Sequence, residues 1–449
     1  MWAMSGRWQM RRILRSSPAS AITLRLREAD VFALRGVPSG YHAGMRAFWL
    51  DSLFASISDA FYGTYTALYV LALGGTRTEV GWLASASSFL GMVMPIPGAS
   101  LTRRWGQRKR MVVVFSVLFR LMLLLAALVP FVAMGRSALY AVLALSVLRV
   151  GFVNFFAPAW VSLTRDVVPL ASRGRYFASR NVMMALTSMM MVPLAGQIIQ
   201  RVGAPRGYQL TLGIAFVVGL VASYTFALIP ETRKHGVRGV TLKAQVRTLW
   251  DALTSDRVFL AFVLIRLLWD FGLQIGGPYF AVYQVEVIKA TPGFIGLLAT
   301  VSAGTRMIGL RVWGPWLDRR GARWVTTVAA LGIPVLPVIW AVSSRPWHLI
   351  LAELPGGFLW AGFEMGIFAL FLELLHGEDD TQAAAGYMAL SSGVSILGPF
   401  IGGWLIAQTG YAGNFLVSGA IRLAAALLFL VVLKPSGHVG TYQDSVPVA

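Results

Sequence analysis

The ten residues GPWLDRRGAR, Gly314–Arg323, have an imperfect copy earlier in the chain, ASLTRRWGQR, Ala99–Arg108. Both copies lie between two long apolar runs, and both place a glycine, Gly321 or Gly106, two residues before an arginine. The two glycines lie almost half of the 449-residue chain apart. A basic turn that recurs at this distance indicates a chain built from two similar halves.

Further short matches run in the same order through both halves. VGWL, Val80–Leu83, corresponds to IGLL, Ile295–Leu298, and the GF at Gly151 corresponds to the GF at Gly357. Each match is weak alone, but ordered matches at a nearly constant offset favour an internal repeat.

The composition indicates a membrane protein. Hydrophobic residues make up 57% of the chain and charged residues 13%, whereas a soluble domain has about 45–50% and about 25%. The absence of cysteine excludes disulfides and thiolate metal sites. The five histidines show no ligand spacing and no phosphate-binding loop is present, so the sequence predicts no metal and no cofactor.

Twelve apolar runs are long enough to cross a bilayer as helices, which takes roughly 20 residues each. β-Barrel strands are excluded, because they are shorter and alternate polar with apolar residues. The predicted fold class is an all-α polytopic membrane protein with twelve transmembrane helices in two six-helix halves. The runs are 47–73, 80–100, 111–134, 138–163, 178–200, 208–230, 258–284, 293–316, 324–343, 347–374, 386–408 and 412–434.

Lysine and arginine are distributed unevenly between the two sets of loops. Most of the 39 basic residues lie in the N-terminal tail and in the segments 103–110, 165–180, 233–257 and 311–323. By the positive-inside rule, these loops and both termini face the cytoplasm of a plasma membrane. The net charge of +20 is therefore a signal of topology, and no nucleic-acid partner is predicted.

The repeat and the loops divide the chain into five parts. They are a basic tail at 1–44, six-helix halves at 45–230 and 258–434, a linker at 231–257 and a C-terminal tail at 435–449. The basic tail is interpreted either as an amphipathic helix at the membrane surface or as a segment without structure. In the linker, VTLKAQVRTLWDAL places its apolar residues on one face, which predicts a helix at the inner surface.

The two-half layout and the basic turns resemble the major facilitator superfamily, whose turn reads G-x-L-x-D-R-x-G-R-R/K. The later copy matches this pattern at Gly314, Asp318, Arg319, Gly321 and Arg323, with Trp316 in place of the leucine. The earlier copy keeps Leu101, Arg104, Gly106 and Arg108. It lacks the first glycine and the aspartate. The resemblance implies a transporter with its substrate site between the halves, working by alternating access.

Three carboxylates inside the spans are candidates for proton coupling. An ionisable residue at bilayer depth costs at least about 2.5–3.5 kcal/mol, so each needs an explanation. Asp59 lies on a polar stripe of the first span and is the first candidate, with Asp270 and Glu364 next. The alternatives are a structural carboxylate at Asp59 and a static ion pair between Asp270 and Arg266, which are four residues apart.

Six further residues are candidates for the substrate cavity, namely Arg149, Arg266, Arg306, Gln274, Tyr62 and Asn154. The alternative is that the three arginines neutralise the three carboxylates inside the bundle. Arg120 and Arg422 fall in spans expected at the periphery, where we expect them to extend toward an interface. The sequence Gly276–Pro278 predicts a break or kink in the seventh span.

The two basic turns are also candidate cytoplasmic gates. In the resembled fold, Asp318 is expected to face the basic segment 173–180, and the earlier turn is expected to face the acidic loop after the tenth span. We therefore expect two oppositely charged latches that hold an outward-open state, unless Arg103 is simply one more positive-inside charge. The predicted gating residues are Arg103, Arg104, Gly106, Arg108, Asp318, Arg319, Gly321, Arg323, Glu378, Asp379 and Asp380.

These features predict a secondary active transporter of a small organic solute, coupled to protons, with efflux slightly favoured. The alternative is uptake of an organic anion by proton symport, and the alternative from a different class is a non-transporting membrane sensor. The expected partners are the small-molecule substrate, protons and the lipid bilayer, and the chain is expected to be a monomer. An enzyme would need clustered catalytic histidine, cysteine or paired carboxylate residues, and the sequence shows no such cluster.

Overall fold

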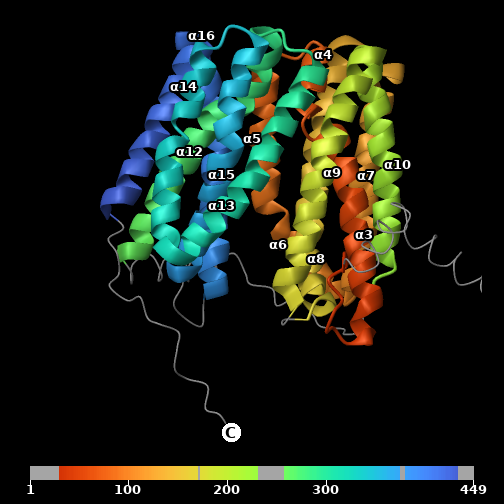
Figure 1. Ribbon diagram of the computed structural model, residues 1–449. Helices are drawn as coiled ribbons and strands as arrows, with labels where there is room; N and C mark the ends of the chain where they lie inside the picture. Colours follow the sequence, from red (N-terminus) through yellow and green to blue (C-terminus); the bar gives the residue numbers. More distant parts are fainter. Residues whose placement is uncertain (1–29, 170–171, 231–256, 375–379, 433–449) are drawn as a thin grey trace, which may run out of the picture.

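The computed structural model describes residues 30–169, 172–230, 257–374 and 380–432, and these residues form helices and no strand (Figure 1). The N-terminal half contains α3 (Ser39–Tyr62), α4 (Thr66–Ala72), α5 (Arg77–Val93), α6 (Pro95–Trp105), α7 (Arg108–Val132), α8 (Gly135–Val167), α9 (Arg173–Val202) and α10 (Arg206–Ala227). The C-terminal half contains α12 (Arg257–Glu286), α13 (Pro292–Gly332), α14 (Val335–Val342), the 3₁₀ turn Pro346–Leu349, α15 (Ile350–Leu374) and α16 (Asp380–Val432).

The predicted twelve-span, two-half arrangement is confirmed. In the described part of the chain, 9 segments are long and apolar enough to cross a membrane. Two of them, Pro292–Val342 and Leu390–Val431, are long enough for two crossings each and reverse at Gly321 and Gly410. α3 together with α4 supplies the remaining crossing. It is absent from the nine segments because the charged residues of α3 lower its hydropathy.

The two copies of the basic turn, Ala99–Arg108 and Gly314–Arg323, both reverse the chain at a glycine. Gly106 ends α6 with a φ of 62°, and Gly321 interrupts α13 with a φ of 80°. A positive φ is unfavourable for residues with a Cβ, so glycine at these positions allows the chain to reverse. The internal repeat is therefore expressed as the same kind of turn in both halves.

Two of the spans begin at side-chain caps. Thr76 begins α5, and the carboxylate of Glu79 accepts a hydrogen bond of 2.9 Å from the Thr76 backbone N–H. Thr291 begins α13 by accepting from the Phe294 N–H, and Pro292 occupies the first helical position. Because these side chains satisfy backbone donors that a helix leaves open, they favour the start of the helix at these two positions.

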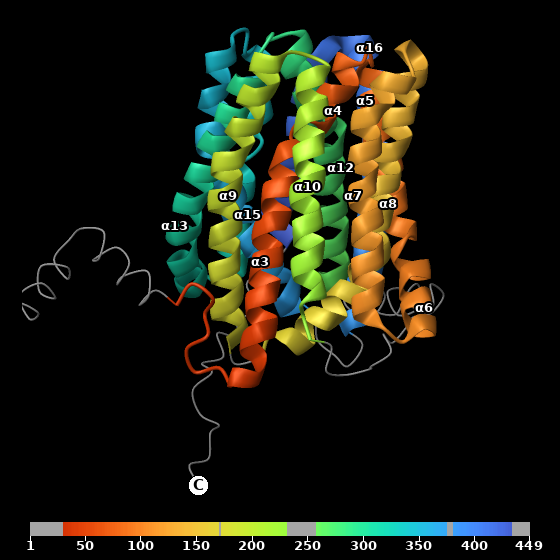
Figure 2. The ribbon, with the colours of Figure 1, turned by 90° about the vertical axis from the view of Figure 1, so that its right-hand side faces the viewer.

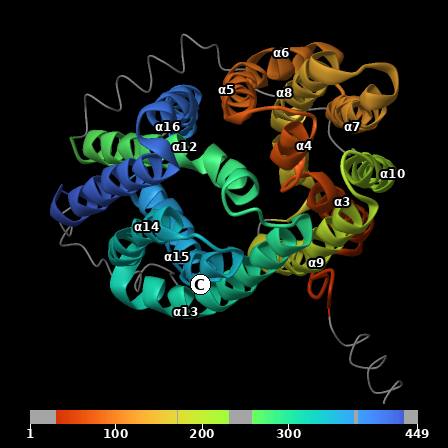
Figure 3. The same ribbon diagram turned by 90° about the horizontal axis from the view of Figure 1, so that it is seen from above.

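The two halves touch at one end and diverge at the other, as Figure 1 shows. We call the end with α4 and the start of α13 the upper end, and the end with the turns at Gly106 and Gly321 the lower end. Seen from above, α9 lies against α13, and α5 lies against α12 and α16 (Figure 3). The Thr300 hydroxyl on α13 donates to the Met189 carbonyl on α9 at 3.0 Å, which joins the halves.

Residues 30–38 pack at the lower end beside α9, so the ordered N-terminal half begins before the predicted boundary at residue 45 (Figure 2). The Arg175 guanidinium donates to the Ala33 carbonyl at 3.3 Å, and Phe32 packs edge-on against Trp49. Burial acts to raise the pKa of Asp30. The hydrogen bonds that its carboxylate accepts from the backbone N–H groups of Arg35 and Leu34 act in the opposite direction, and the pKa lies below its usual value. Residues 39–44 of the basic tail belong to α3, whereas residues 1–29, the predicted linker helix and the C-terminal tail lie outside the described residues.

Candidate substrate cavity and charged pairs

A cavity of about 610 Å³ lies between the halves, with most of its wall in the C-terminal half. Thr64, between α3 and α4, is its contribution from the N-terminal half. Phe280, Trp340 and Trp360 supply aromatic surface, and Arg306 and Glu353 supply charge. Ligand sites commonly combine apolar walls with a few polar groups in a volume of about 300–1,000 Å³.

An exposed ion pair stands at this cavity. Arg306 on α13 and Glu364 on α15 form a two-pronged pair in which Nη1 lies 3.2 Å from Oε1 and Nη2 bonds Oε2. Their side chains are 43% and 50% exposed. Since Arg306 lines the cavity, a solute with polar groups would compete for this pair.

A largely buried ion pair on α12 is hydrogen-bonded to α16. The predicted pair between Arg266 and Asp270 is present, with Nη2 and Oδ1 2.9 Å apart, and the Ser391 hydroxyl donates to Asp270 at 2.7 Å. One turn further along α12, the Gln274 amide donates to the Ser395 hydroxyl at 3.1 Å. Asp270 and Gln274 therefore both connect the seventh and eleventh spans.

The seventh span does not break at its Gly-Gly-Pro sequence. α12 runs without interruption from Arg257 to Glu286, with Pro278 inside it. The predicted break is therefore wrong, while the kink that the sequence also allows at Pro278 stays a prediction. Gly276 serves close packing instead, because α16 leaves no room for a side chain opposite it. A Cβ built at that residue would lie 2.9 Å from the Ser418 hydroxyl oxygen.

The N-terminal half holds the third group of predicted residues. The Tyr62 hydroxyl donates to the Asp59 carboxylate at 2.7 Å, and the Arg149 guanidinium lies 4.1 Å from the centre of the Tyr62 ring. Asp59 is exposed, whereas Tyr62 is buried. Asn154 donates to the carbonyl of Val150 in its own helix. The six charged residues of the predicted network thus fall into three separate groups, each with one acid and one base.

Sequence reasoning missed a buried charge cluster in the N-terminal half. Asp51 is 9% exposed and lies within electrostatic range of Arg120 and Arg180. Arg120 donates to the Gly219 carbonyl on α10, and Arg180 donates to the Ser52 hydroxyl on α3. Asp51 precedes Asp59 by eight residues, about two helical turns, so its place on the same face was readable.

The expectation that Arg120 and Arg422 extend to a membrane interface is wrong. They are 5% and 2% exposed, respectively. Arg120 is held by the Gly219 carbonyl between α7 and α10, and Arg422 lines the cavity between the halves. Helix packing, which a single span does not reveal, places both guanidinium groups inside the bundle.

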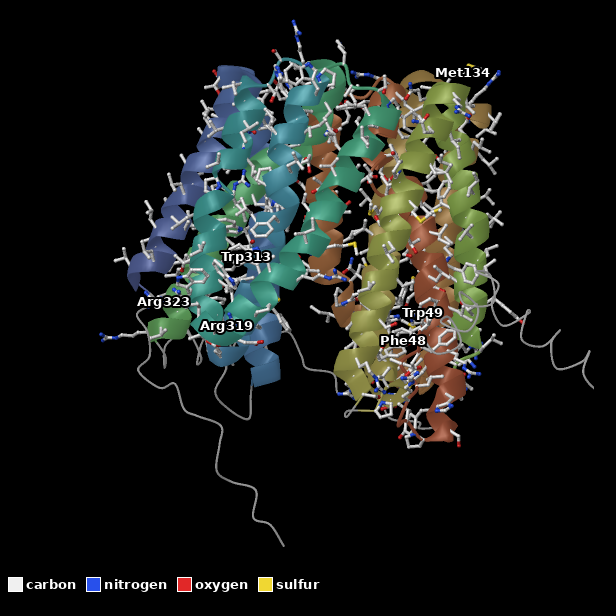
Figure 4. All side chains as sticks on the ribbon, viewed as in Figure 1. Phe48, Trp49, Met134, Trp313, Arg319 and Arg323 are labelled. Carbon is white, nitrogen blue, oxygen red and sulfur yellow. The ribbon has the colours of Figure 1, made fainter. Side chains whose placement is uncertain are left out.

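The gate residues lie apart at the lower end, where Figure 4 shows Arg319 and Arg323 beneath Trp313. Arg108 pairs inside its own half, with Nη2 2.6 Å from the Asp166 carboxylate. Arg323 donates to the Leu430 carbonyl at 2.9 Å, while Arg104, Arg319 and the acid Asp318 are exposed. The side chains of Arg103 and Asp380, and all of Glu378 and Asp379, lie outside the described residues, so the latch hypothesis stays a prediction.

The fold, the cavity and the paired turns define a transporter of the two-half kind. The sequence matches the Major Facilitator Superfamily over residues 48–291 and 271–446, and the chain belongs to this family. It is therefore a multi-pass membrane transporter rather than an enzyme.

Several curated relatives are named for export, but each similarity is partial. The chain is 23% identical over 195 residues to a putative sugar efflux transporter of Deinococcus radiodurans, covering 42% of this chain and 49% of the relative. It is 29% identical over 188 residues to the enterobactin exporter EntS of Escherichia coli, covering 40% and 43%. The chain thus spans about half or less of the length of these relatives.

Solved structures share the fold at low identity. The nucleoside transporter NupG superposes with a TM-score of 0.68 at 13% identity, covering 86% of this chain and 100% of that structure. A D-xylose-proton symporter superposes with a TM-score of 0.63 at 16% identity, covering 85% and 95%. These structures agree with the two-half arrangement and carry no information on the solute of this chain.

Proposed function

We propose that the chain is a secondary active exporter of small amphipathic organic solutes, driven by protons and working by alternating access as a monomer in the plasma membrane. The observation that carries this proposal is the cavity of about 610 Å³ between two halves that touch at only one end. A cavity in this position can face one side of the membrane and then the other when the halves rock.

The charge distribution supports the orientation in the membrane. The lower end carries the exposed basic residues Arg104, Arg110, Arg175, Arg319 and Arg320. By the positive-inside rule this end faces the cytoplasm, and the two halves are then closed toward the outside. A cytoplasmic solute would enter the cavity in the conformation described.

Asp59 is the proposed proton carrier. Its carboxylate is exposed, so protons can reach it, and it accepts a hydrogen bond from Tyr62, whose ring contacts Arg149. Protonation would remove the charge that attracts Arg149, which couples the proton to the position of α8. Asp270 is less suited, because it is 4% exposed and holds two partners.

Export is favoured over uptake by the names of similar proteins, and the anion site at Arg266 and Arg306 that the uptake alternative assumes is occupied by carboxylates of the chain. Similar proteins are named as an efflux transporter, a multi-drug resistance efflux pump and an exporter. Arg266 and Arg306, which were expected to hold an anion, are paired with carboxylates. The aromatic surface at Trp340 and Trp360 instead suits an amphipathic body.

Flux in proteoliposomes with an imposed pH gradient tests the proposal. Three probes, ethidium, 2-naphthoate and 2-naphthamide, cover cationic, anionic and neutral amphipathic solutes. We expect the gradient to drive at least one probe, and Asp59→Asn to reduce that driven flux at least tenfold while exchange without a gradient continues. Glu286→Gln is the matched control, because Glu286 is also an exposed carboxylate that accepts a hydrogen bond from a tyrosine, Tyr411, and it lies at the upper end of α12.

Two outcomes would count against this account. Driven flux that survives Asp59→Asn unchanged would remove Asp59 from the coupling step. An absence of flux for every probe, in protein that is folded and oriented, would favour a sensor over a transporter.

A further inference from the structure

Arg422 is a buried cation at the wall of the cavity. It lies in the last span, on the part of α16 that follows Gly410, and it is 2% exposed. Its guanidinium donates to one residue of its own helix, with Nε 3.2 Å from the Ser418 carbonyl and Nη2 3.0 Å from the Ser418 hydroxyl. Among the described residues, no carboxylate lies within ion-pair distance of it.

Two other arginines of the C-terminal half each have a carboxylate partner. Arg266 is paired with Asp270, and Arg306 is paired with Glu364. A buried guanidinium without a carboxylate is unfavourable, because two serine oxygens do not replace the lost hydration or balance the charge. Arg422 is more deeply buried than either of these arginines and lacks the partner that both of them have.

The neighbouring helix leaves room for the Arg422 side chain to reach the cavity. A Cβ built at Gly272 on α12 would lie 3.1 Å from Cγ of Arg422 and 2.9 Å from Ile421. A larger residue at Gly272 would therefore collide with this side chain. Because α12 carries a glycine here, the arginine of a peripheral span can line the central cavity.

The surroundings of Arg422 in the cavity are mainly apolar. Phe280, Trp340 and Trp360 line the same cavity, and the Phe280 and Trp340 ring centres lie 4.7 Å apart. Glu353 is the acid on this wall, and its side chain is hydrogen-bonded to Ser302. It precedes Trp360 by seven residues, which corresponds to about 10 Å along the helix.

We propose that Arg422 binds the anionic group of the transported solute, a carboxylate or sulfonate, while an aromatic or aliphatic body packs against Phe280, Trp340 and Trp360. The anion supplies the counter-charge that the described residues do not, and a planar guanidinium can bind it with two parallel hydrogen bonds. The proposal rests on the proposed transport function and narrows its substrate class to amphipathic organic anions.

Equilibrium binding to the purified full-length chain in detergent, without any gradient, tests the proposal. The probes are 2-naphthoate and 2-naphthamide, which have the same body and differ in charge. We expect the wild type to bind 2-naphthoate at least tenfold more tightly, and Arg422→Gln to bind both probes about equally. Arg120→Gln is the matched control, because Arg120 is buried in a peripheral span away from this cavity, and it should keep the preference.

Three results of the binding experiment would contradict the proposed role of Arg422. Equal wild-type affinities, a preference that survives Arg422→Gln, or chloride that displaces 2-naphthoate at an equal concentration would overturn the proposal. If Arg422→Gln does not fold, Arg422→Lys must weaken 2-naphthoate at least threefold and leave 2-naphthamide unchanged. Loss of pH-driven flux with the binding preference intact would reject proton coupling alone, so the two failures are distinguishable.

Discussion

Gly296→Val is expected to reduce transport at least tenfold while both halves remain folded. Gly296 on α13 crosses α9 at the upper end, and a Cβ built there would lie 2.7 Å from Cα of Pro193 and 2.8 Å from the Tyr65 hydroxyl. Side chains forced into a packed contact cost about 1–3 kcal/mol, which shifts a two-state equilibrium roughly 5- to 150-fold. The upper end would then stay open, and the cycle would stop in one state.

The same helix offers a matched control for this substitution. Nothing lies within 4 Å of a Cβ built at Gly304, two turns further along α13, so Gly304→Val adds the same side chain without a collision. We expect Gly304→Val to transport close to the wild-type rate in the same proteoliposome assay. Equal activity of the two variants would mean that the close contact between α9 and α13 does not have to form during transport.

Asp270→Ala is expected to lower the stability of the C-terminal half by about 3 kcal/mol, because it leaves Arg266 in the bundle without its carboxylate. It also removes the acceptor of the Ser391 hydroxyl, so α12 and α16 lose a contact. In detergent we expect the melting temperature to fall by roughly 5 °C or more.

Two further variants show whether the stability lost in Asp270→Ala comes from the broken buried ion pair or from removal of any carboxylate. Glu364→Ala breaks the exposed pair with Arg306 and should change the stability by about 0–1 kcal/mol. Replacing both buried partners, with Arg266→Met and Asp270→Leu, should recover most of the lost stability, since no charge is left unpaired. A double variant as unstable as Asp270→Ala would show that the pair is not the cause.

The spans and their number were predictable because hydropathy reports directly on burial in a bilayer. The twelve predicted runs coincide with helices, although the first is interrupted by a turn at residues 63–65 and the sixth continues past the end of α10 at Ala227. The helices extend beyond most of the runs where the ends carry polar residues, as α8 does through Asp166. The pair between Arg266 and Asp270 was predictable for a similar reason, because residues four apart in a helix are always neighbours.

Contacts between helices far apart in the sequence were not predictable in this way. The sequence places Arg422 in an apolar run, but only the packing of α16 against Gly272 directs it to the cavity. The pair between Arg108 and Asp166, 58 residues away in the same half, was not predicted for the same reason. A single span carries no information about the face that its neighbour covers.

Distances between spin labels at the two ends of the molecule test the central claim, alternating access, most directly. The chain has no cysteine, so label sites can be added in pairs, Gln107→Cys with Arg319→Cys at the lower end and Met134→Cys with Val342→Cys at the upper end. These four residues are exposed, and Met134 lies at the upper end in Figure 4. Adding Gly296→Val should shorten the lower distance and lengthen the upper one. Two distances that stay unchanged, or that change in the same direction, would contradict the account.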